Sequence, residues 1–193
     1  KMNWLSKFVE LAAAILQKPE DSVRFANNPG PFSSIIPAFS AFSLAAAGYL
    51  LRDYYEGIFL FTISFHASVL TLVYVLFASL TSAVLDARVQ TQSGRSPRAS
   101  QARRVLLQSL LPLIFAFPAA TIAHITPVPG FVFVPLLLLL YAWAFITALR
   151  SLQYLYELSI RDIARQLVIS SVITLAFPAA LVVLLFVRLA AFL

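Results

Sequence analysis

Residues 88–104 read RVQTQSGRSPRASQARR, and this strip decides how the rest of the chain is arranged. It holds five arginines and no acidic residue. Long apolar runs lie on both sides of it, GIFLFTISFHASVLTLVYVLFASLTSAVL before and VLLQSLLPLIFAFPAA after. Arginine is costly to move through hydrocarbon, so such a strip stays on one side of a membrane. The strip therefore predicts a basic cytoplasmic loop, residues 86–104, between two membrane spans.

The composition of the whole chain agrees with a membrane protein. Of its 193 residues, 61% are hydrophobic and 11% are charged, whereas a soluble globular domain holds about 25% charged residues. That leaves too little polar surface to cover a body exposed to water. The chain has no cysteine, which excludes a disulfide framework and a thiolate metal site.

Five apolar runs reach or nearly reach the roughly 20 residues that a helix needs to cross the hydrocarbon core. They are residues 32–51, 57–85, 105–126, 131–149 and 167–187. The second run is longer than needed, so it must tilt or project beyond the bilayer. All five are apolar on every side, without the alternation of a membrane β-barrel. We expect an all-α integral membrane protein, a single five-helix transmembrane bundle over residues 1–193.

The basic residues orient this bundle. Five spans place the two termini on opposite sides of the membrane. If the N-terminus is cytoplasmic, twelve of the 14 lysines and arginines lie on the cytoplasmic side, and only Arg52 and Arg188 lie outside. We therefore expect a multi-pass membrane protein with its N-terminus in the cytoplasm and its C-terminus outside.

The first 31 residues form a cytoplasmic or interfacial segment. Within it, MNWLSKFVELAAAILQK has helical periodicity, but it is too short and too charged to span. One side carries an apolar stripe, Trp4, Leu5, Phe8, Leu11, Ala12, Ile15 and Leu16. This pattern predicts an amphipathic helix that lies in the membrane interface, packs against the bundle, or does both.

A second cytoplasmic helical segment, residues 150–166, follows the fourth run. Its sequence RSLQYLYELSIRDIARQ keeps a helical spacing of apolar residues on each side of a bend near LSIRD. Ser159 is a suitable N-cap for the helix that restarts there, with Asp162 three residues on. The fourth span should therefore extend into the cytoplasm, and a new helix should lead into the fifth.

The sequence contains no recognisable enzyme motif. HExxH, GxSxG, a P-loop and a glycine-rich nucleotide fingerprint are all absent. We expect no carboxylate within an apolar core, so groups for acid–base catalysis are nearly lacking. These observations predict a protein that is not an enzyme and that binds no cofactor or metal.

His66 is the titratable side chain that falls inside a predicted span. It is a candidate intramembrane polar site, for a ligand or for a hydrogen bond between helices. The alternative is a neutral histidine whose partner is a serine, a threonine or a backbone group of the bundle.

The sequence AFPAA occurs at 116–120 and again at 176–180. Pro118 and Pro178 each remove a backbone donor and are candidate helix kinks. The pair indicates either paired hinges in a parallel repeat or chance in a chain rich in alanine and phenylalanine. The small residues of the first span could likewise serve a homo-oligomer contact or simple internal packing.

The arginines of the basic strip are candidate contacts for anionic lipids or for an acidic protein partner. They are Arg88, Arg95, Arg98, Arg103 and Arg104. The alternative is that they only set topology. Nucleic acid is not expected, because the aromatic residues lie inside the apolar runs and do not alternate with the basic ones.

Several stretches resemble the Yip-domain family, membrane proteins related to the Rab-interacting Yip proteins of eukaryotes. These stretches are ILQKPEDSVRF before the first span, GPF at 30–32, and YAWAFITALRSLQYLYELSIRDIARQL leading into the last span. The chain has NNP where the eukaryotic pattern has Asp-Leu-Tyr, so the resemblance does not carry Rab binding with it. Its short form is similar to prokaryotic members, which implies a prokaryotic cytoplasmic membrane.

The resemblance implies a non-enzymatic scaffold or adaptor that organises protein or lipid partners at the cytoplasmic face. Two alternatives remain open. One is a small-molecule or ion transporter or channel, acting as an oligomer with His66 on its path. The other is an accessory subunit of a larger membrane complex.

Overall fold

The computed structural model describes residues 4–27, 32–51, 59–94, 96–125 and 133–190. These residues are almost entirely helical, and no strand occurs among them. The elements in order are α1 (Trp4–Gln17), η1 (Pro19–Asp21), α2 (Ser22–Asn27), α3 (Phe32–Leu50), α4 (Phe59–Ser93), α5 (Ala99–Gln108), η2 (Leu111–Phe115), α6 (Ala116–Ile125), α7 (Phe133–Tyr156) and α8 (Ile160–Ala190).

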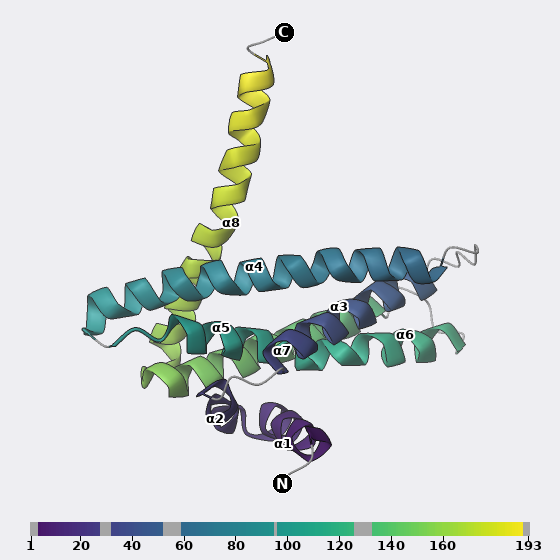
Figure 1. The fold of residues 1–193 in the computed structure, drawn as a ribbon, viewed down its shortest axis with the longest axis horizontal. Helices are drawn as coiled ribbons and strands as arrows, with labels where there is room; N and C mark the ends of the chain where they lie inside the picture. Colours follow the sequence, from purple (N-terminus) through teal and green to yellow (C-terminus); the bar gives the residue numbers. More distant parts are fainter. Residues whose placement is uncertain (1–3, 28–31, 52–58, 95, 126–132, 191–193) are drawn as a thin grey trace.

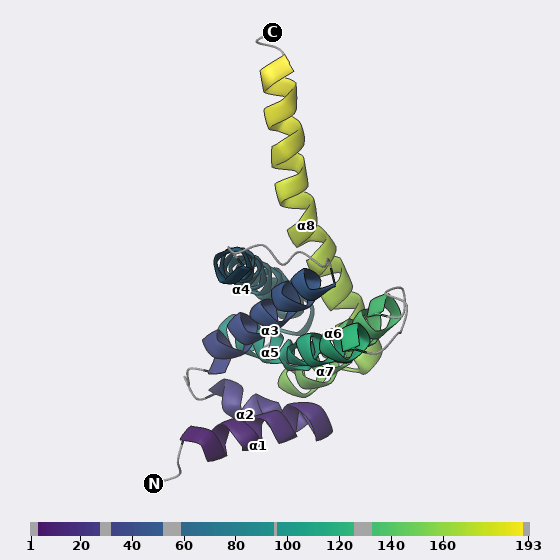
Figure 2. The same ribbon diagram turned by 90° about the vertical axis from the view of Figure 1, so that its right-hand side faces the viewer.

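Four helices of the bundle share one direction, as Figure 1 shows, and α8 runs across it. Helices α3, α4, α6 and α7 run along the long axis of the molecule, with α5 and η2 continuing into α6. Helices α1 and α2 lie on one side of this bundle, and α8 leaves it on the opposite side (Figure 2). The C-terminal half of α8 stands clear of the other helices in both views.

Within the described ranges, four helical segments are long and apolar enough to cross a membrane: Phe32–Leu50, Leu60–Gln92, Ala99–Ile125 and Phe133–Tyr156. The prediction of an all-helical, multi-pass membrane protein is therefore confirmed. The fifth predicted span, residues 167–187, lies within α8, and most of its later side chains lie outside the described residues. That span stays a prediction.

The surface of α4 shows where lipid would meet the protein. Large apolar side chains are exposed along it from Leu60, 67% exposed, to Leu80, 49% exposed. Twenty residues at 1.5 Å per residue cover about 30 Å, which equals the thickness of the hydrocarbon core. If this stretch fills the hydrocarbon core, the last turns of α4 extend beyond it, and the expected tilt or projection of the second run stays a prediction.

The basic strip differs from its prediction as a loop over residues 86–104. Helix α4 continues to Ser93 and α5 begins at Ala99, so only residues 94–98 separate two helices. The helices extend because Leu85, Val89 and Val105, all at most 1% exposed, pack into one hydrophobic cluster with α7 and α8. Burial of one apolar face stabilises each helix here, although charged residues lie between the apolar ones.

Helix α4 ends at Ser93, and Gly94 directly follows it. This glycine has φ +63°, and its N–H donates to the Gln90 carbonyl at 2.8 Å. A left-handed residue with this bond is a common helix C-terminus, and glycine adopts it without a Cβ penalty. The turn sends the chain back toward α5, which packs on α4.

The third span is broken in the middle, between α5 and α6. Serine side chains of α3 form hydrogen bonds with backbone groups that the break leaves without helical partners. Pro118 has no N–H, so the Ile114 carbonyl lacks its usual helical donor. The Ser43 hydroxyl donates to that carbonyl at 2.7 Å and accepts the Phe117 N–H at 2.9 Å. Ser40 donates to the Leu110 carbonyl at 2.9 Å in the same way. Ser40 and Ser43, two of the small residues of the first span, therefore serve internal packing, and a homo-oligomer contact through this span stays a prediction.

Helix α1 packs on the bundle through its apolar stripe. Leu11 and Ile15 are at most 1% exposed and cluster with Phe32, Ile36 and Leu111. We expected this helix to pack against the bundle, to lie in the membrane interface, or both, and the packing is observed. Its position in a membrane interface stays a prediction.

The bend between α7 and α8 matches the sequence pattern. Helix α7 ends at Tyr156 and α8 begins at Ile160. The Asp162 N–H donates to the Ser159 hydroxyl at 3.2 Å, and that hydroxyl donates to the Asp162 carboxylate at 2.6 Å. The prediction of Ser159 as N-cap is confirmed.

Candidate functional site at the charged end of the bundle

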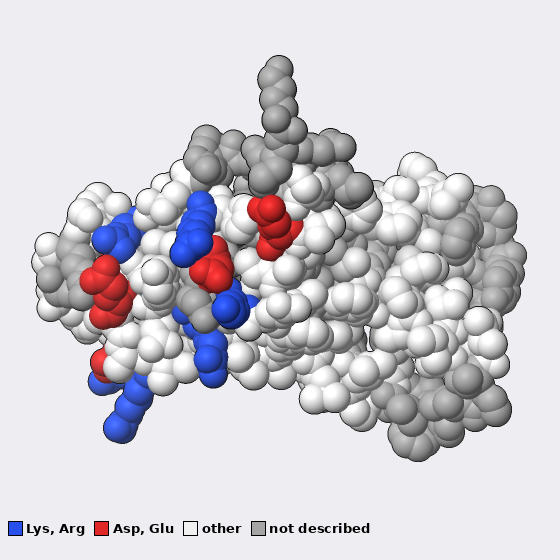
Figure 3. Space-filling model, turned by 90° about the horizontal axis from the view of Figure 1, so that it is seen from below, with Lys and Arg blue, Asp and Glu red and all other residues white. Residues whose placement is uncertain are grey.

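Charged side chains gather at one end of the molecule. Figure 3 shows Lys, Arg, Asp and Glu over one half of the visible face, while the white atoms of the other half belong to uncharged residues. The C-terminal ends of α4 and α7 and the N-terminal ends of α5 and α8 meet at this end, next to α2 (Figure 1). We call this region the charged end. Its exposed charged residues include Arg24, Arg103, Arg150, Glu157, Arg161, Asp162 and Arg165.

A buried carboxylate, Asp86, holds the charged end together. It is 3% exposed. Its Oδ1 accepts the Tyr156 hydroxyl and the Arg98 backbone N–H, each at 2.9 Å. Its Oδ2 accepts the Gln90 side-chain amide at 2.6 Å. One side chain of α4 thus fixes the residue before α5 and the last residue of α7.

The expectation that no carboxylate lies in an apolar core is therefore wrong. Asp86 directly follows Leu85, the last residue of the second apolar run, and is enclosed by the same cluster of α4, α5, α7 and α8 side chains. Its burial is possible because three donors replace the water that both oxygens lose.

Two arginines of the basic strip bind carbonyl groups at helix ends. The Arg98 guanidinium donates to the Leu155 carbonyl in the last turn of α7. The Arg104 guanidinium donates to the Ala26 carbonyl at the end of α2, at 2.7 Å. Such carbonyls have no partner within their own helix and carry partial negative charge. These contacts tie α5 to α7 and to α2.

Arg88 binds across to α8. Its Nε donates to the Gln166 side-chain oxygen at 2.8 Å, and the Gln166 amide donates to the Gln92 side-chain oxygen at 2.7 Å. Deeper in the bundle, Thr81 donates to Thr174 at 3.3 Å between the same two helices. These polar contacts fix the first half of α8 on α4.

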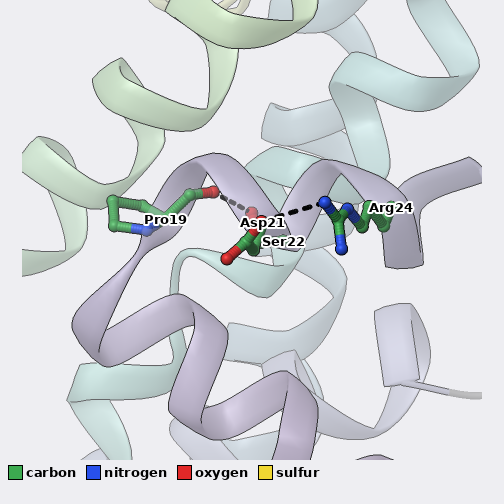
Figure 4. A network of polar contacts seen from close by, with 4 residues as sticks. All are labelled: Pro19, Asp21, Ser22 and Arg24. Atoms are coloured by element: carbon green, nitrogen blue, oxygen red, sulfur yellow. Dashed lines mark hydrogen bonds and ion pairs between the residues drawn. The ribbon is translucent and has the colours of Figure 1, made fainter.

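The linker between α1 and α3 is tied to α7. Ser151 donates to the Pro19 carbonyl at 2.7 Å, and the hydroxyls of Ser151 and Ser22 lie 2.9 Å apart. Figure 4 shows Ser22 donating to the same Pro19 carbonyl, at 2.6 Å, beside the exposed Asp21–Arg24 ion pair at 3.7 Å. The charged end is thus a cap of interlocked helix ends.

The structure divides the five candidate arginines. Arg88, Arg98 and Arg104 hydrogen-bond within the chain, and Arg103 is exposed on α5. Arg95 lies outside the described residues. Of the group expected to contact lipid or a partner, three side chains thus have a structural role as well.

His66 lies on the outside of α4. Its side chain is exposed, its Nδ1 lies 2.8 Å from the Thr62 carbonyl, and its ring packs edge-on to Phe65. The histidine has the backbone partner that the alternative interpretation names, on its own helix. It does not face the interior of the bundle.

The two predicted kink prolines have different settings. Pro118 is the third residue of α6, next to the break described above. Pro178 lies inside α8, which continues as helix to Ala190. Across the described parts of the chain, no group of three or more His, Cys, Asp or Glu side chains is placed to hold a metal ion.

Sequence reasoning missed Asp86, Tyr156 and Gln166. One signal could have found Asp86. It lies on the same helical face as Leu85 and Val89, so a helix continued past the apolar run would bury it. Comparison with protein-family models, with curated proteins and with solved structures finds no match to this chain.

Proposed function

We propose that this protein is a non-enzymatic membrane scaffold of Yip-domain type, which organises protein or lipid partners at its charged end. In this proposal the charged end faces the cytoplasm of a prokaryotic cell. Partners are a protein docked at this end, membrane lipids, and a second copy of the chain.

The construction of the charged end supports this proposal best. Asp86, Arg98 and Arg104 are used to lock helix ends together, and other charged side chains point outward from that cap. A rigid polar surface on a membrane anchor suits docking, because its groups are already ordered before a partner arrives.

The transporter alternative has less support. It uses His66 on a path through the bundle, whereas this side chain is exposed on α4 and bonded to the backbone of its own helix. The scaffold therefore remains the proposal.

Topology is the first test. Ser96 is exposed at the charged end, and Ile125, 76% exposed, lies at the other end of the bundle. In intact cells an impermeant maleimide should label Ile125→Cys and should spare Ser96→Cys until the cells are permeabilised. Labelling of Ser96→Cys in intact cells would place the charged end outside and refute the proposed docking face.

Partner capture is the second test. A photo-crosslinking amino acid at Arg103 should give discrete adducts in native membranes. The same group at Leu72, 59% exposed on the apolar face of α4, is the matched control. Equal adduct patterns at the two positions would contradict a docking surface at the charged end.

A further inference from the structure

An open hollow of about 550 Å³ lies beside the end of α7. Arg150, Gln153, Tyr154, Glu157 and Leu158 line it. The first four residues follow the spacing i, i+3, i+4 and i+7, which places them along one face of a helix. The face is accessible, since Tyr154 is 60% exposed and both Arg150 and Glu157 are exposed.

The same face of α7 continues toward the membrane with exposed apolar side chains. Leu139, Trp143 and Ile146 are 66%, 40% and 52% exposed and lie eleven, seven and four residues before Arg150. Eleven residues at 1.5 Å each span about 16 Å, close to half of the ~30 Å hydrocarbon core. The face therefore has the length of one lipid, with an apolar part as long as one leaflet.

The charges follow the order found in a zwitterionic phospholipid. Arg150 lies seven residues, about 10 Å along the helix, nearer to the apolar part than Glu157. In a phosphatidylethanolamine, the phosphodiester lies next to the glycerol and the ammonium lies farther out. We propose that this hollow binds a phosphatidylethanolamine-type lipid, with Arg150 on the phosphate and Glu157 on the ammonium.

The backbone at Glu157 is a second sign of a functional position. Its φ is +51°, directly after the last residue of α7. Glycine is the usual residue there, because an L-residue in this conformation brings its Cβ close to the following carbonyl oxygen. Outliers of this kind gather at ligand sites. Here the costly residue places a carboxylate in the lining of the hollow.

The remaining lining fits a headgroup. Tyr154 is an aromatic residue at the boundary of the apolar face, where membrane proteins concentrate tyrosine and tryptophan. Gln153 adds an amide that can donate to a phosphate oxygen or accept from an ammonium. A phosphatidylglycerol would find Arg150 but would bring no cation for Glu157, so the site discriminates between the two headgroups.

Trp143 reports directly on this site. It stacks on Phe115 with ring centroids 6.5 Å apart and planes 5° apart, which fixes its orientation on the face. The chain has two tryptophans, so Trp4→Phe leaves Trp143 as the sole fluorophore. The full chain is placed in phosphatidylcholine nanodiscs that contain a small fraction of acyl-brominated phosphatidylethanolamine or phosphatidylglycerol, and quenching of Trp143 by contact with bromine is measured.

The brominated phosphatidylethanolamine should be enriched at Trp143 about fivefold over brominated phosphatidylglycerol, since one charge contact near a membrane surface is worth ~1 kcal/mol. Glu157→Gln should remove this preference and leave quenching by phosphatidylglycerol unchanged. Arg150→Gln should lower quenching by both lipids. Glu10→Gln, which removes one exposed carboxylate on α1, is the matched control and should change neither.

Equal quenching by the two lipids in the parent protein would overturn the proposal, and so would a preference that survives Glu157→Gln. The lipid site rests on one part of the proposed function, namely that the charged end lies at the level of the lipid headgroups. Crosslinked partners at Arg103 without any lipid preference at Trp143 would leave the scaffold proposal standing and remove this site alone. Labelling of Ser96→Cys in intact cells would remove the scaffold proposal and leave the lipid site standing, because either leaflet can supply the lipid.

Discussion

Replacement of Asp86 by alanine is the sharpest test of how the charged end is held together. The change removes both oxygens that accept from Tyr156, Arg98 and Gln90, in a place that is 3% exposed. The Tyr156 hydroxyl and the Arg98 N–H would lose their acceptor where water has little access. The Gln90 amide is nearer the surface and can turn to solvent.

The expected cost follows from these three bonds. Hydrogen bonds to a charged group contribute about 1.5–3 kcal/mol each, and their losses overlap because they share one carboxylate. We expect Asp86→Ala to destabilise the protein by ~3–5 kcal/mol, as for other broken buried charge networks. Asp86→Asn keeps Oδ1 for two donors, and a flipped Gln90 amide can accept from the new NH₂ group. That variant should lose only about 1 kcal/mol, one ordinary hydrogen bond.

Thermal unfolding in detergent measures the difference. At roughly 2–4 °C per kcal/mol for a chain of this size, a 3 kcal/mol loss lowers Tm by about 6–12 °C, and the asparagine variant should fall by a few degrees only. Hydrogen exchange of residues 96–102 should rise in Asp86→Ala alone. An alanine variant within 1 °C of the parent, or an asparagine variant as unstable as alanine, would refute the idea that Asp86 locks these helix ends.

Three further variants test single features. Ser43→Ala should cost ~1–2 kcal/mol through the unpaired Ile114 carbonyl and Phe117 N–H. The cost should be smaller in a Pro118→Ala background, where a backbone N–H returns for the carbonyl, and equal costs in both backgrounds by Tm would contradict the capping. Gly94→Ala should lose about 1 kcal/mol from its positive φ alone, since an added Cβ would meet nothing within 4 Å, and a neutral result would argue against the left-handed turn. Glu157→Gly should raise stability by roughly 0.5–1 kcal/mol while abolishing the preference for phosphatidylethanolamine, and a lower Tm would show that the strain is absent.

The helical membrane architecture could be predicted from the sequence because hydrocarbon acts on each segment separately. A run that is apolar on all sides needs no partner to be identified as a span. The first predicted run, residues 32–51, differs from α3 by a single residue at its end. The cap at Ser159 was equally predictable, since its partner Asp162 lies three residues away.

The boundaries of the basic strip were missed because its charge dominated the interpretation. Leu85 and Val89 lie four residues apart, and Ala102 and Val105, both buried, lie three apart. The helical pattern thus continues into the strip from both sides. The cluster that they join also contains residues of α7 and α8, from Leu152 onward, which lie 50 or more residues after Ala102. A single sequence does not show that pairing.

The candidate site could not be predicted from the sequence either, because its contacts also join distant parts of the chain. Arginine in a cytoplasmic loop has the same sequence signature whether it binds solvent, lipid or a carbonyl. Arg98 and Arg104 find their acceptors at Leu155 and Ala26 only after the helix ends have met. The hydroxyl of Ser43 likewise reaches a carbonyl 71 residues away.

The broken third span has a consequence for biosynthesis. The third segment is apolar enough to span, but the Ile114 carbonyl has no donor in its own helix and costs free energy in lipid until Ser43 reaches it. In the natural order of synthesis α3 precedes the third segment. Ser40 and Ser43 are therefore already present when the Leu110 and Ile114 carbonyls need donors. A circular permutant that makes α3 last should insert the third segment less completely, which weaker maleimide labelling of Ile125→Cys in intact cells would record.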